Sequence, residues 1–157
     1  MSATPIKRHK SLQPFSRDHH HGLLLCWKIR EGFKKNIAPE RIKKYTDWFW
    51  NDHLKQHFDE EEKYIFSILS ADDALVVQAL SEHKKLKSLF EDNKNIVESL
   101  QTLEKELNDH IRFEERVLFK KVQEIATEEQ LQLIANIHKD DLNDQWKDEF
   151  WVREKKV

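Results

Sequence analysis

The chain has 157 residues, of which 36% are charged, and its formal net charge at pH 7 is -2. A surface that is densely charged but carries no excess of positive charge argues against a nucleic-acid-binding protein. Only 2 glycines and 3 prolines are present, too few turn residues for a fold of many strands, so a single all-α domain is expected.

The first two predicted helices follow a polar, basic segment. Residues 1–14 are expected to form a flexible arm that enters the first helix near Phe15. Apolar residues and one histidine then recur at helical spacing: Leu12, Phe15, His19, Gly22, Cys26, Ile29 and Phe33. Pro39 is placed to begin the second helix, because its missing N–H is not needed in a first turn. This helix is expected to reach about Leu69, with one side formed by Ile42, Phe49, His53, His57, Glu61, Tyr64 and Ile68.

Three further helices are predicted. Capping residues at 70–73 begin the third helix, which runs to about Glu91 with an inner stripe of Val76, Ala79, Leu80, His83, Leu86 and Phe90. After a turn at 92–95, the fourth helix presents Ile96, Leu100, Leu103, Leu107, His110, Glu114, Val117 and Lys121. A capping-box pattern at 127–130 opens the fifth helix, which carries Leu131, Ile134, His138 and Leu142. The tail from residue 146 is expected to continue helical or to fray.

An internal repeat links the second and fourth helices. Residues 57–66 and 110–119 both read H-x-x-x-E-E-x-x-x-F, and an acid-histidine pair precedes each copy, at 18–19 and 82–83. A spacing of four places a histidine and a glutamate on the same face of a helix. Because the predicted turns lie almost midway between successive histidines, all four histidines reach one level of an up-down-up-down bundle. The six side chains that meet there are His19, His57, Glu61, His83, His110 and Glu114.

This set of side chains predicts a metal site. Imidazole with carboxylate suits iron, manganese or zinc, and two glutamates among four histidines suit a pair of ions bridged by carboxylate. Without metal, several of these buried polar groups would have no partner. The predicted organisation is an arm at 1–14, a metal-binding bundle at 15–125 and a C-terminal helix at 126–157 that packs on or caps the bundle.

Several neighbouring residues leave alternatives open. His20 and His21 compete with His19 as the ligand from the first helix, and His19 is favoured because it lies on the inner stripe and matches His83 in the repeat. His53 is either a further ligand, a supporting group or a packing residue. Glu62 and Glu115 are either solvated or hold a ligand in position. Tyr64 is interpreted as a core residue, with donation of a hydrogen bond to a bridging oxygen as the alternative.

The motifs RDHHHGL, HFDEEEKYIF, SEHKKL and HIRFEERVLF, spread over about residues 12 to 122, resemble those of the hemerythrin-like, or HHE cation-binding, family. The resemblance implies a bundle of the hemerythrin type in which the six side chains hold two non-haem iron ions, bridged by Glu61 and Glu114 and by an oxo or hydroxo group. Oxygen-carrying hemerythrins also pair a fifth histidine with an aspartate in an H-x4-D motif. The corresponding position here is Glu115 or Glu114, which argues against simple oxygen carriage.

The expected function is binding or sensing of oxygen or nitric oxide, or iron handling. No nucleophile elbow, phosphate loop or Cys-His arrangement is present, so a non-catalytic metal-binding protein is favoured. The alternatives are a metal-dependent peroxidase or nitric oxide reductase, an iron-centre repair protein, and a structural bundle with zinc or no metal. One cysteine and the absence of a long apolar run predict a cytoplasmic protein without a membrane partner. A protein partner could dock on the C-terminal helix.

Overall fold

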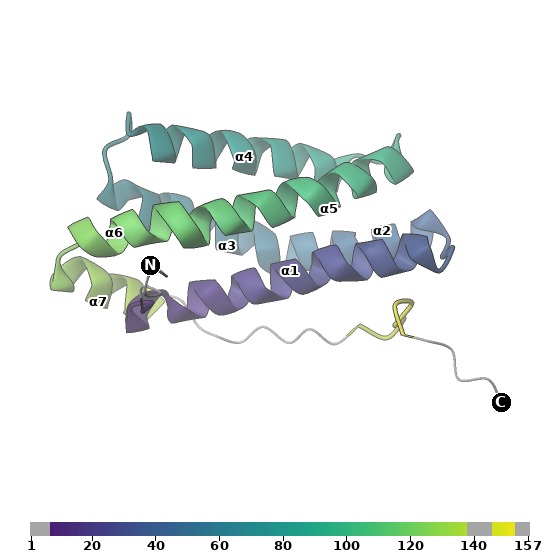
Figure 1. Cartoon of the computed structure of the whole chain (residues 1–157), viewed down its shortest axis with the longest axis horizontal. Helices are drawn as coiled ribbons and strands as arrows, with labels where there is room; N and C mark the ends of the chain where they lie inside the picture. Colours follow the sequence, from purple (N-terminus) through teal and green to yellow (C-terminus); the bar gives the residue numbers. More distant parts are fainter. Residues whose placement is uncertain (1–6, 138–145, 153–157) are drawn as a thin grey trace, which may run out of the picture.

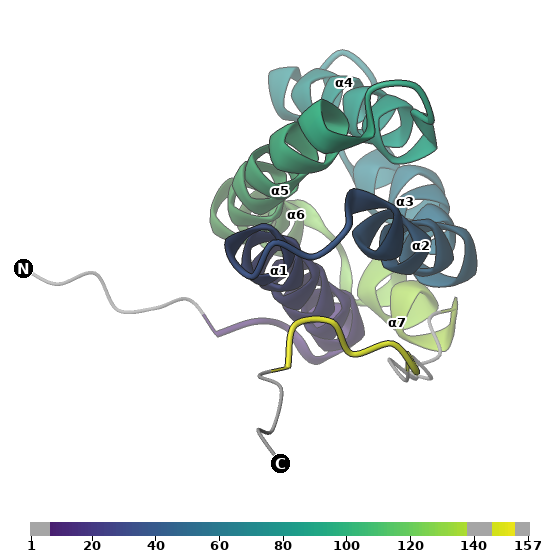
Figure 2. The same ribbon diagram turned by 90° about the vertical axis from the view of Figure 1, so that its right-hand side faces the viewer.

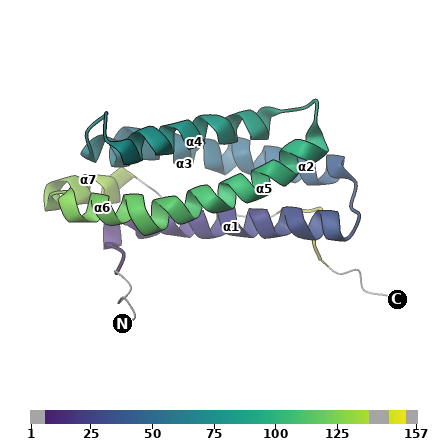
Figure 3. The same ribbon diagram turned by 45° about the horizontal axis from the view of Figure 1, so that its top comes forward.

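The computed structural model describes residues 7–137 and 146–152, and every regular element within these ranges is helical. Four helical rods run up, down, up and down along one long axis (Figure 1), and seen from the end they surround that axis (Figure 2). A shorter helix, α7, lies at one end of the bundle (Figure 3). The predicted fold, an all-α four-helix bundle with an additional C-terminal helix, is therefore confirmed.

A tight turn joins the first two rods. The first rod is α1 (Gln13–Lys34), which follows a 3₁₀ turn at Lys10–Leu12. After it, Asn36 adopts a left-handed φ of 56°, and the N–H of Ile37 donates to the carbonyl of Gly32 at 2.9 Å, which closes the helix end. The second rod begins at Pro39 as predicted. It comprises α2 (Pro39–Phe49), a π-helical segment (Trp50–Leu54), α3 (Lys55–Glu60), a second π-helical segment (Glu61–Ile65) and a 3₁₀ turn (Phe66–Ile68).

The capping residues expected from the sequence begin the later helices. Asp73 caps α4 (Ala74–Glu91) by accepting the N–H of Leu75 at 2.8 Å. The N–H of Thr127 donates to the side chain of Gln130 at 2.9 Å, and the N–H of Gln130 donates to the Thr127 hydroxyl at 3.1 Å. This capping box precedes α7 (Glu128–Ile137). The fourth rod comprises α5 (Ile96–Phe113), a π-helical segment (Glu114–Leu118) and α6 (Phe119–Ile125).

A π-helical segment begins at the first glutamate of each repeat copy and changes which residues face inward. A π turn holds one residue more than an α turn, so the inward stripe moves on by one position. Tyr64 and Val117 were predicted to face the core, but they are 37% and 43% exposed. The residues that follow them, Ile65 and Leu118, are fully buried instead. The core role predicted for Tyr64 is therefore wrong.

The ends of the described chain pack on the bundle. At the first end, Leu12 is fully buried and Arg8 forms an ion pair with Glu115 at 3.0 Å, and α1 begins at Gln13 rather than Phe15. Residues 146–152 form turns rather than a helix, and Phe150 within them is buried. The fifth-helix positions 138 and 142 lie outside the described residues. The domain boundaries at 14 and 125 stay predictions.

Two clusters of buried apolar side chains fill the bundle, one on each side of the level of the four histidines. The larger cluster includes Cys26, Tyr45 and Leu107, and the smaller includes Phe15 and Val122. Leu80 was predicted to belong to the inner stripe of α4, but it is 40% exposed at the edge of that helix. Within the described ranges, every helix is too short or too polar to traverse a lipid bilayer.

Candidate metal centre

The six side chains singled out in the sequence meet at one level of the bundle. Each rod supplies one histidine, from α1, α3, α4 and α5, and each π-helical segment of the repeat supplies one glutamate at its first position. The two glutamates are fully buried and the four histidines are at most 4% exposed. All six therefore lie in one shared, solvent-shielded pocket: His19, His57, Glu61, His83, His110 and Glu114.

The pocket divides into two sets of donor atoms that share both glutamates. One set adds His19 and His57 to the glutamate pair, and the other adds His83 and His110. Within each set, every residue offers a nitrogen or oxygen within 4.8 Å of the others. Each set could hold one ion, and Glu61 and Glu114 would contribute donor atoms to both.

Distances between the donor atoms fit this division. In the first set, the Nε2 atoms of His19 and His57 lie 3.4 and 3.2 Å from Glu61 oxygens. In the second set, the Nε2 atoms of His83 and His110 lie 3.2 and 2.6 Å from the Oε1 atom of Glu114. Nitrogen and oxygen atoms converge from both sides on the same small volume, which is the requirement for ion coordination by side chains of facing helices.

Four carboxylates outside the pocket each accept a hydrogen bond from the outer nitrogen of one of the four pocket histidines. Asp18 of α1 accepts from the Nδ1 atom of His57 at 3.0 Å, and Glu82 of α4 accepts from that of His110 at 2.7 Å. Each bond crosses from one rod to another. The bond fixes the orientation of the ring. Because the single proton of a neutral imidazole then lies on Nδ1, the Nε2 atom has a free lone pair that can bind a metal.

The remaining two histidines are held by the second glutamate of each repeat copy. Glu62 accepts from the Nδ1 atom of His83 at 2.9 Å, and Glu115 accepts from that of His19 at 2.8 Å. Sequence reasoning left these two glutamates open between solvation and support of a ligand, and the structure gives them the supporting position. From the sequence, Asp18 and Glu82 were interpreted only as members of the acid-histidine pairs, with no supporting role. The recurrence of an acidic residue before each repeat copy was the signal that indicated this role.

The last residue of the repeat motif packs on a histidine of another rod. Phe66 lies 5.2 Å from the ring of His83, and Phe119 lies 5.1 Å from that of His19, measured between ring centroids. Phe58 stacks on the ring of His83, with 3.8 Å between the ring centroids and the two rings nearly parallel. These aromatic rings close the pocket against water and restrict the motion of the imidazoles.

The histidines and glutamates of the pocket shift one another's pKa values. Burial disfavours the protonated form of His57, but Glu61 and Asp18 outweigh it and raise its pKa to about 9. Burial likewise opposes ionisation of Glu114, yet the surrounding imidazoles, His110 first among them, hold the pKa of its carboxyl well below the usual range. The carboxylates are thus ionised at neutral pH, and in the absence of metal their charge is balanced by protons on imidazole.

Polar atoms left over in the pocket provide a test of whether metal fits. Both oxygens of Glu61 and the Nε2 atoms of three histidines are buried and make only the close contacts within the pocket, none of them with hydrogen-bond geometry: His19, His57 and His110. An unpaired buried polar atom costs roughly 1–3 kcal/mol, so a cluster of them is unfavourable unless something binds there. Imidazole nitrogen and carboxylate oxygen are both ligands of iron, manganese and zinc, so the donor set fits such ions.

The neighbouring alternatives do not join the pocket. His20 is exposed, whereas His19 beside it is buried in the site. His53 packs edge-on against Trp48, with 4.9 Å between ring centroids, and belongs to neither set of donor atoms. Tyr64 is 37% exposed, unlike the buried side chains of the pocket. The three residues therefore contribute surface and packing rather than donor atoms.

A buried pocket in which facing helices offer two histidine sets around a shared carboxylate pair defines a metal-binding helical bundle. The model of the hemerythrin HHE cation binding domain matches residues 15–122, which span all four rods and all six side chains. The chain belongs to this family. No curated protein and no solved structure gives a significant match to the chain.

Proposed function

We propose that the pocket holds two iron ions and that the protein uses them to bind or sense a small diatomic ligand, oxygen or nitric oxide. The observation that carries this proposal is the division of the buried donors into two sets that share Glu61 and Glu114. One ion would leave two imidazoles without a partner. A pair of ions bridged by the two carboxylates employs every donor atom.

The symmetry of the two sets supports binding of an external ligand. Each set offers two imidazoles and the same two carboxylates. Non-haem iron held by histidine and carboxylate commonly keeps coordination positions open for a small molecule. When bound, the metal pair would supply redox-active ions with such open positions, and this chain's residues would orient the ligands and exclude water.

The surroundings of the pocket favour a small, uncharged ligand. Buried apolar clusters lie on both sides of the histidine level, and they include Phe15, Phe66 and Phe119 next to the imidazoles. Such walls carry no hydrogen-bonding groups for a polar substrate. A diatomic molecule can enter a dry pocket of this kind by small side-chain motions, whereas a charged metabolite would lose its hydration without compensation.

The polar partners of the six side chains favour binding over catalysis. Within the described residues, four carboxylates outside the pocket are hydrogen-bonded to its side chains. Each of them accepts from the Nδ1 atom of one imidazole. None of these carboxylates faces the shared volume between the two donor sets. A reaction that needs a protein acid beside the ligand is therefore less well supported than reversible binding.

Metal analysis of protein purified from iron-replete cells tests the proposal. We expect about two iron ions per chain and a visible spectrum that changes reversibly when oxygen or nitric oxide is added and removed. His83→Ala should remove most of the metal, whereas His20→Ala, a change at an exposed histidine, should leave metal content unchanged. Zinc alone, or no metal in the unaltered protein, would contradict the proposal and favour a structural bundle. Turnover with a peroxide or nitric oxide and an electron donor would favour the enzyme alternative.

A further inference from the structure

The segment before α1 is connected to the metal pocket through Arg8. The guanidinium of Arg8 forms an ion pair with one carboxylate oxygen of Glu115 at 3.0 Å and donates to the backbone carbonyl of the same residue at 2.6 Å. The other carboxylate oxygen of Glu115 accepts from the Nδ1 atom of His19 at 2.8 Å. Glu115 therefore lies between a cation outside the bundle and a histidine of the pocket, with one oxygen bound to each.

A second connection between Arg8 and His19 passes through an aromatic ring. The guanidinium carbon of Arg8 lies 5.5 Å from the centroid of the Phe119 ring. The same ring stacks on His19, with 5.1 Å between the ring centroids, and it is fully buried. A guanidinium over an aromatic face is attracted by the negative charge of that face. Arg8 thus contacts both of the side chains that restrict the His19 imidazole from outside the pocket.

Hydrogen bonds hold the backbone around Arg8 against α6. The Arg8 side chain and the backbone N–H of His9 both donate to the side-chain oxygen of Gln123 at 3.0 Å. The side-chain amide of Gln123 donates in turn to the carbonyl of Lys7 at 3.2 Å. A few residues further on, the fully buried Leu12 fixes the chain in the core. The position of the guanidinium is therefore set by its neighbours in the chain as well as by Glu115.

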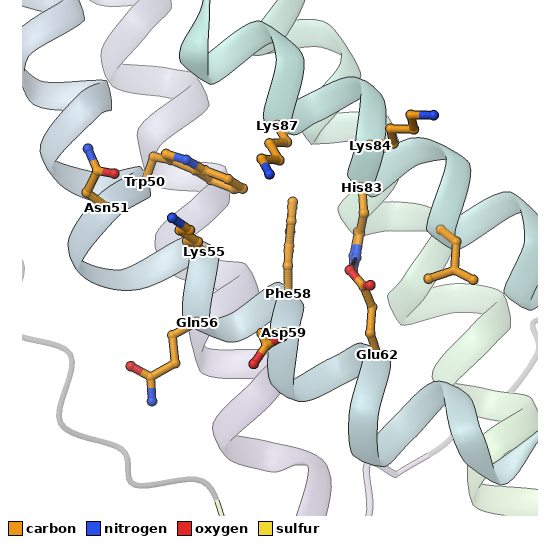
Figure 4. A pocket seen from close by; sticks show the side chains of 11 residues that line it. Trp50, Asn51, Lys55, Gln56, Phe58, Asp59, Glu62, His83, Lys84 and Lys87 are labelled. Atoms are coloured by element: carbon orange, nitrogen blue, oxygen red, sulfur yellow. Dashed lines mark hydrogen bonds and ion pairs between the residues drawn. The ribbon is translucent and has the colours of Figure 1, made fainter.

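The other half of the repeat has no such cation. Glu62 takes the place of Glu115 in the first repeat copy and accepts from the Nδ1 atom of His83 at 2.9 Å. Figure 4 shows the Glu62 carboxylate meeting His83, while Lys84 extends away from the pair. Among the described residues, Glu62 forms no ion pair with a lysine or arginine, and its side chain is 42% exposed against 26% for Glu115. The two halves therefore offer the same donor atoms but support them differently.

We propose that Arg8 is a positioning residue for the metal ion held by His19 and His57, and that it makes the two metal positions unequal. Arg8 keeps the Glu115 carboxylate turned toward His19, and without the guanidinium this side chain can turn into water. A carboxylate that orients a metal-bound imidazole commonly sets metal affinity, so a residue that holds the carboxylate affects the same quantity. The inference rests on the metal occupancy proposed above, although its contacts are formed by the chain alone.

Stepwise addition of Co²⁺ to the chelator-treated full chain, followed by visible absorption, measures the two metal positions. Histidine and carboxylate are both ligands of this ion. Arg8→Gln should weaken one of the two binding steps by about tenfold and leave the other unchanged. Arg8→Lys should restore part of the affinity, because an ammonium keeps the charge but not the planar fork of the guanidinium. In a Glu115→Gln background, Arg8→Gln should cause no further loss, since its effect passes through that carboxylate.

Arg30→Gln provides the matched control for loss of an ion pair. Arg30 pairs with Glu104 at 2.6 Å and lies on the same helix as His19, about 16 Å further along its axis. This variant should bind Co²⁺ as the unaltered chain does. Equal weakening of both steps in Arg8→Gln, the same loss in the control, or a further full loss in the Glu115→Gln background would overturn the positioning role.

Imidazole NMR of the metal-free chain at fixed pH separates this inference from the proposed function. In Arg8→Gln, the Nδ1 proton signal of His19 should shift or broaden by exchange with water, whereas that of His83 should stay where it is. An unchanged His19 signal, or equal changes at both histidines, would overturn the positioning role whatever metal the protein carries. Purified protein without iron that still shows the Arg8 effects on Co²⁺ binding and on His19 would contradict the proposed function alone.

Discussion

Loss of the carboxylate that supports His110 should weaken metal binding without unfolding the bundle. Glu82 accepts from the His110 Nδ1 atom at 2.7 Å, the shortest of the four supporting bonds, and its side chain is 29% exposed. The bond is charge-assisted, and such bonds contribute roughly 1.5–3 kcal/mol. In Glu82→Ala, water can reach the freed nitrogen and recover part of this. We therefore expect metal affinity to fall about tenfold to a hundredfold.

Competition with a chromophoric chelator at fixed pH measures this change in affinity. Glu82→Gln keeps an oxygen acceptor but loses the charge, so its loss should be smaller, about tenfold or less. Glu124→Gln removes an exposed carboxylate of α6 and serves as the control. Circular dichroism should show the same helix content in all three variants. Unchanged affinity in Glu82→Ala, or an equal loss in the control, would refute the idea that the outer carboxylates tune the site.

Three further outcomes follow from the packing and the pKa shifts. A Cβ at Gly32 would lie 2.6 Å from Ile42 and 3.0 Å from Phe150, so Gly32→Ala should destabilise the chain by about 1 kcal/mol in urea unfolding, and adding Ile42→Val should restore part of it. Burial raises the pKa of the Cys26 thiol to about 12, so iodoacetamide at pH 8 should label it only after unfolding; rapid labelling of the folded chain would contradict this. His57 has a pKa of about 9 in the folded, metal-free chain against 6.5 when unfolded. Protonated His57 should therefore stabilise the folded, metal-free chain by on the order of 3 kcal/mol below pH 6.5, and this contribution should disappear as the pH rises through 9. Urea unfolding of chelator-treated protein at a series of pH values would measure the change in the free energy of unfolding.

The helical rods and their ends were determined by local sequence. Pro39, Asp73 and the capping box at 127–130 stand where helices begin, and each acts through backbone groups within a few residues of itself. The level at which the histidines meet was also predictable, because turn positions and helix rise set it. For that reason the six side chains brought together in the pocket are the six that the repeat pattern indicated.

The inward face beyond each glutamate was decided by the tertiary structure. Helical periodicity assumes a constant number of residues per turn, and it placed Tyr64 and Val117 in the core. The π-helical segments add a residue at the point where the glutamates enter the pocket, so Ile65 and Leu118 are buried instead. A local pattern cannot reveal this, because the insertion is stabilised by contacts between rods.

The pairing of histidines with their supporting carboxylates was likewise decided only in three dimensions. Each carboxylate supports a histidine on a different rod: Asp18 lies next to His19 in sequence but holds His57, and Glu82 lies next to His83 but holds His110. Sequence by itself determined which residue types gather at this level of the bundle. Which carboxylate reaches which imidazole depends on the rotation and spacing of the packed helices, and these follow from side-chain packing across the whole core.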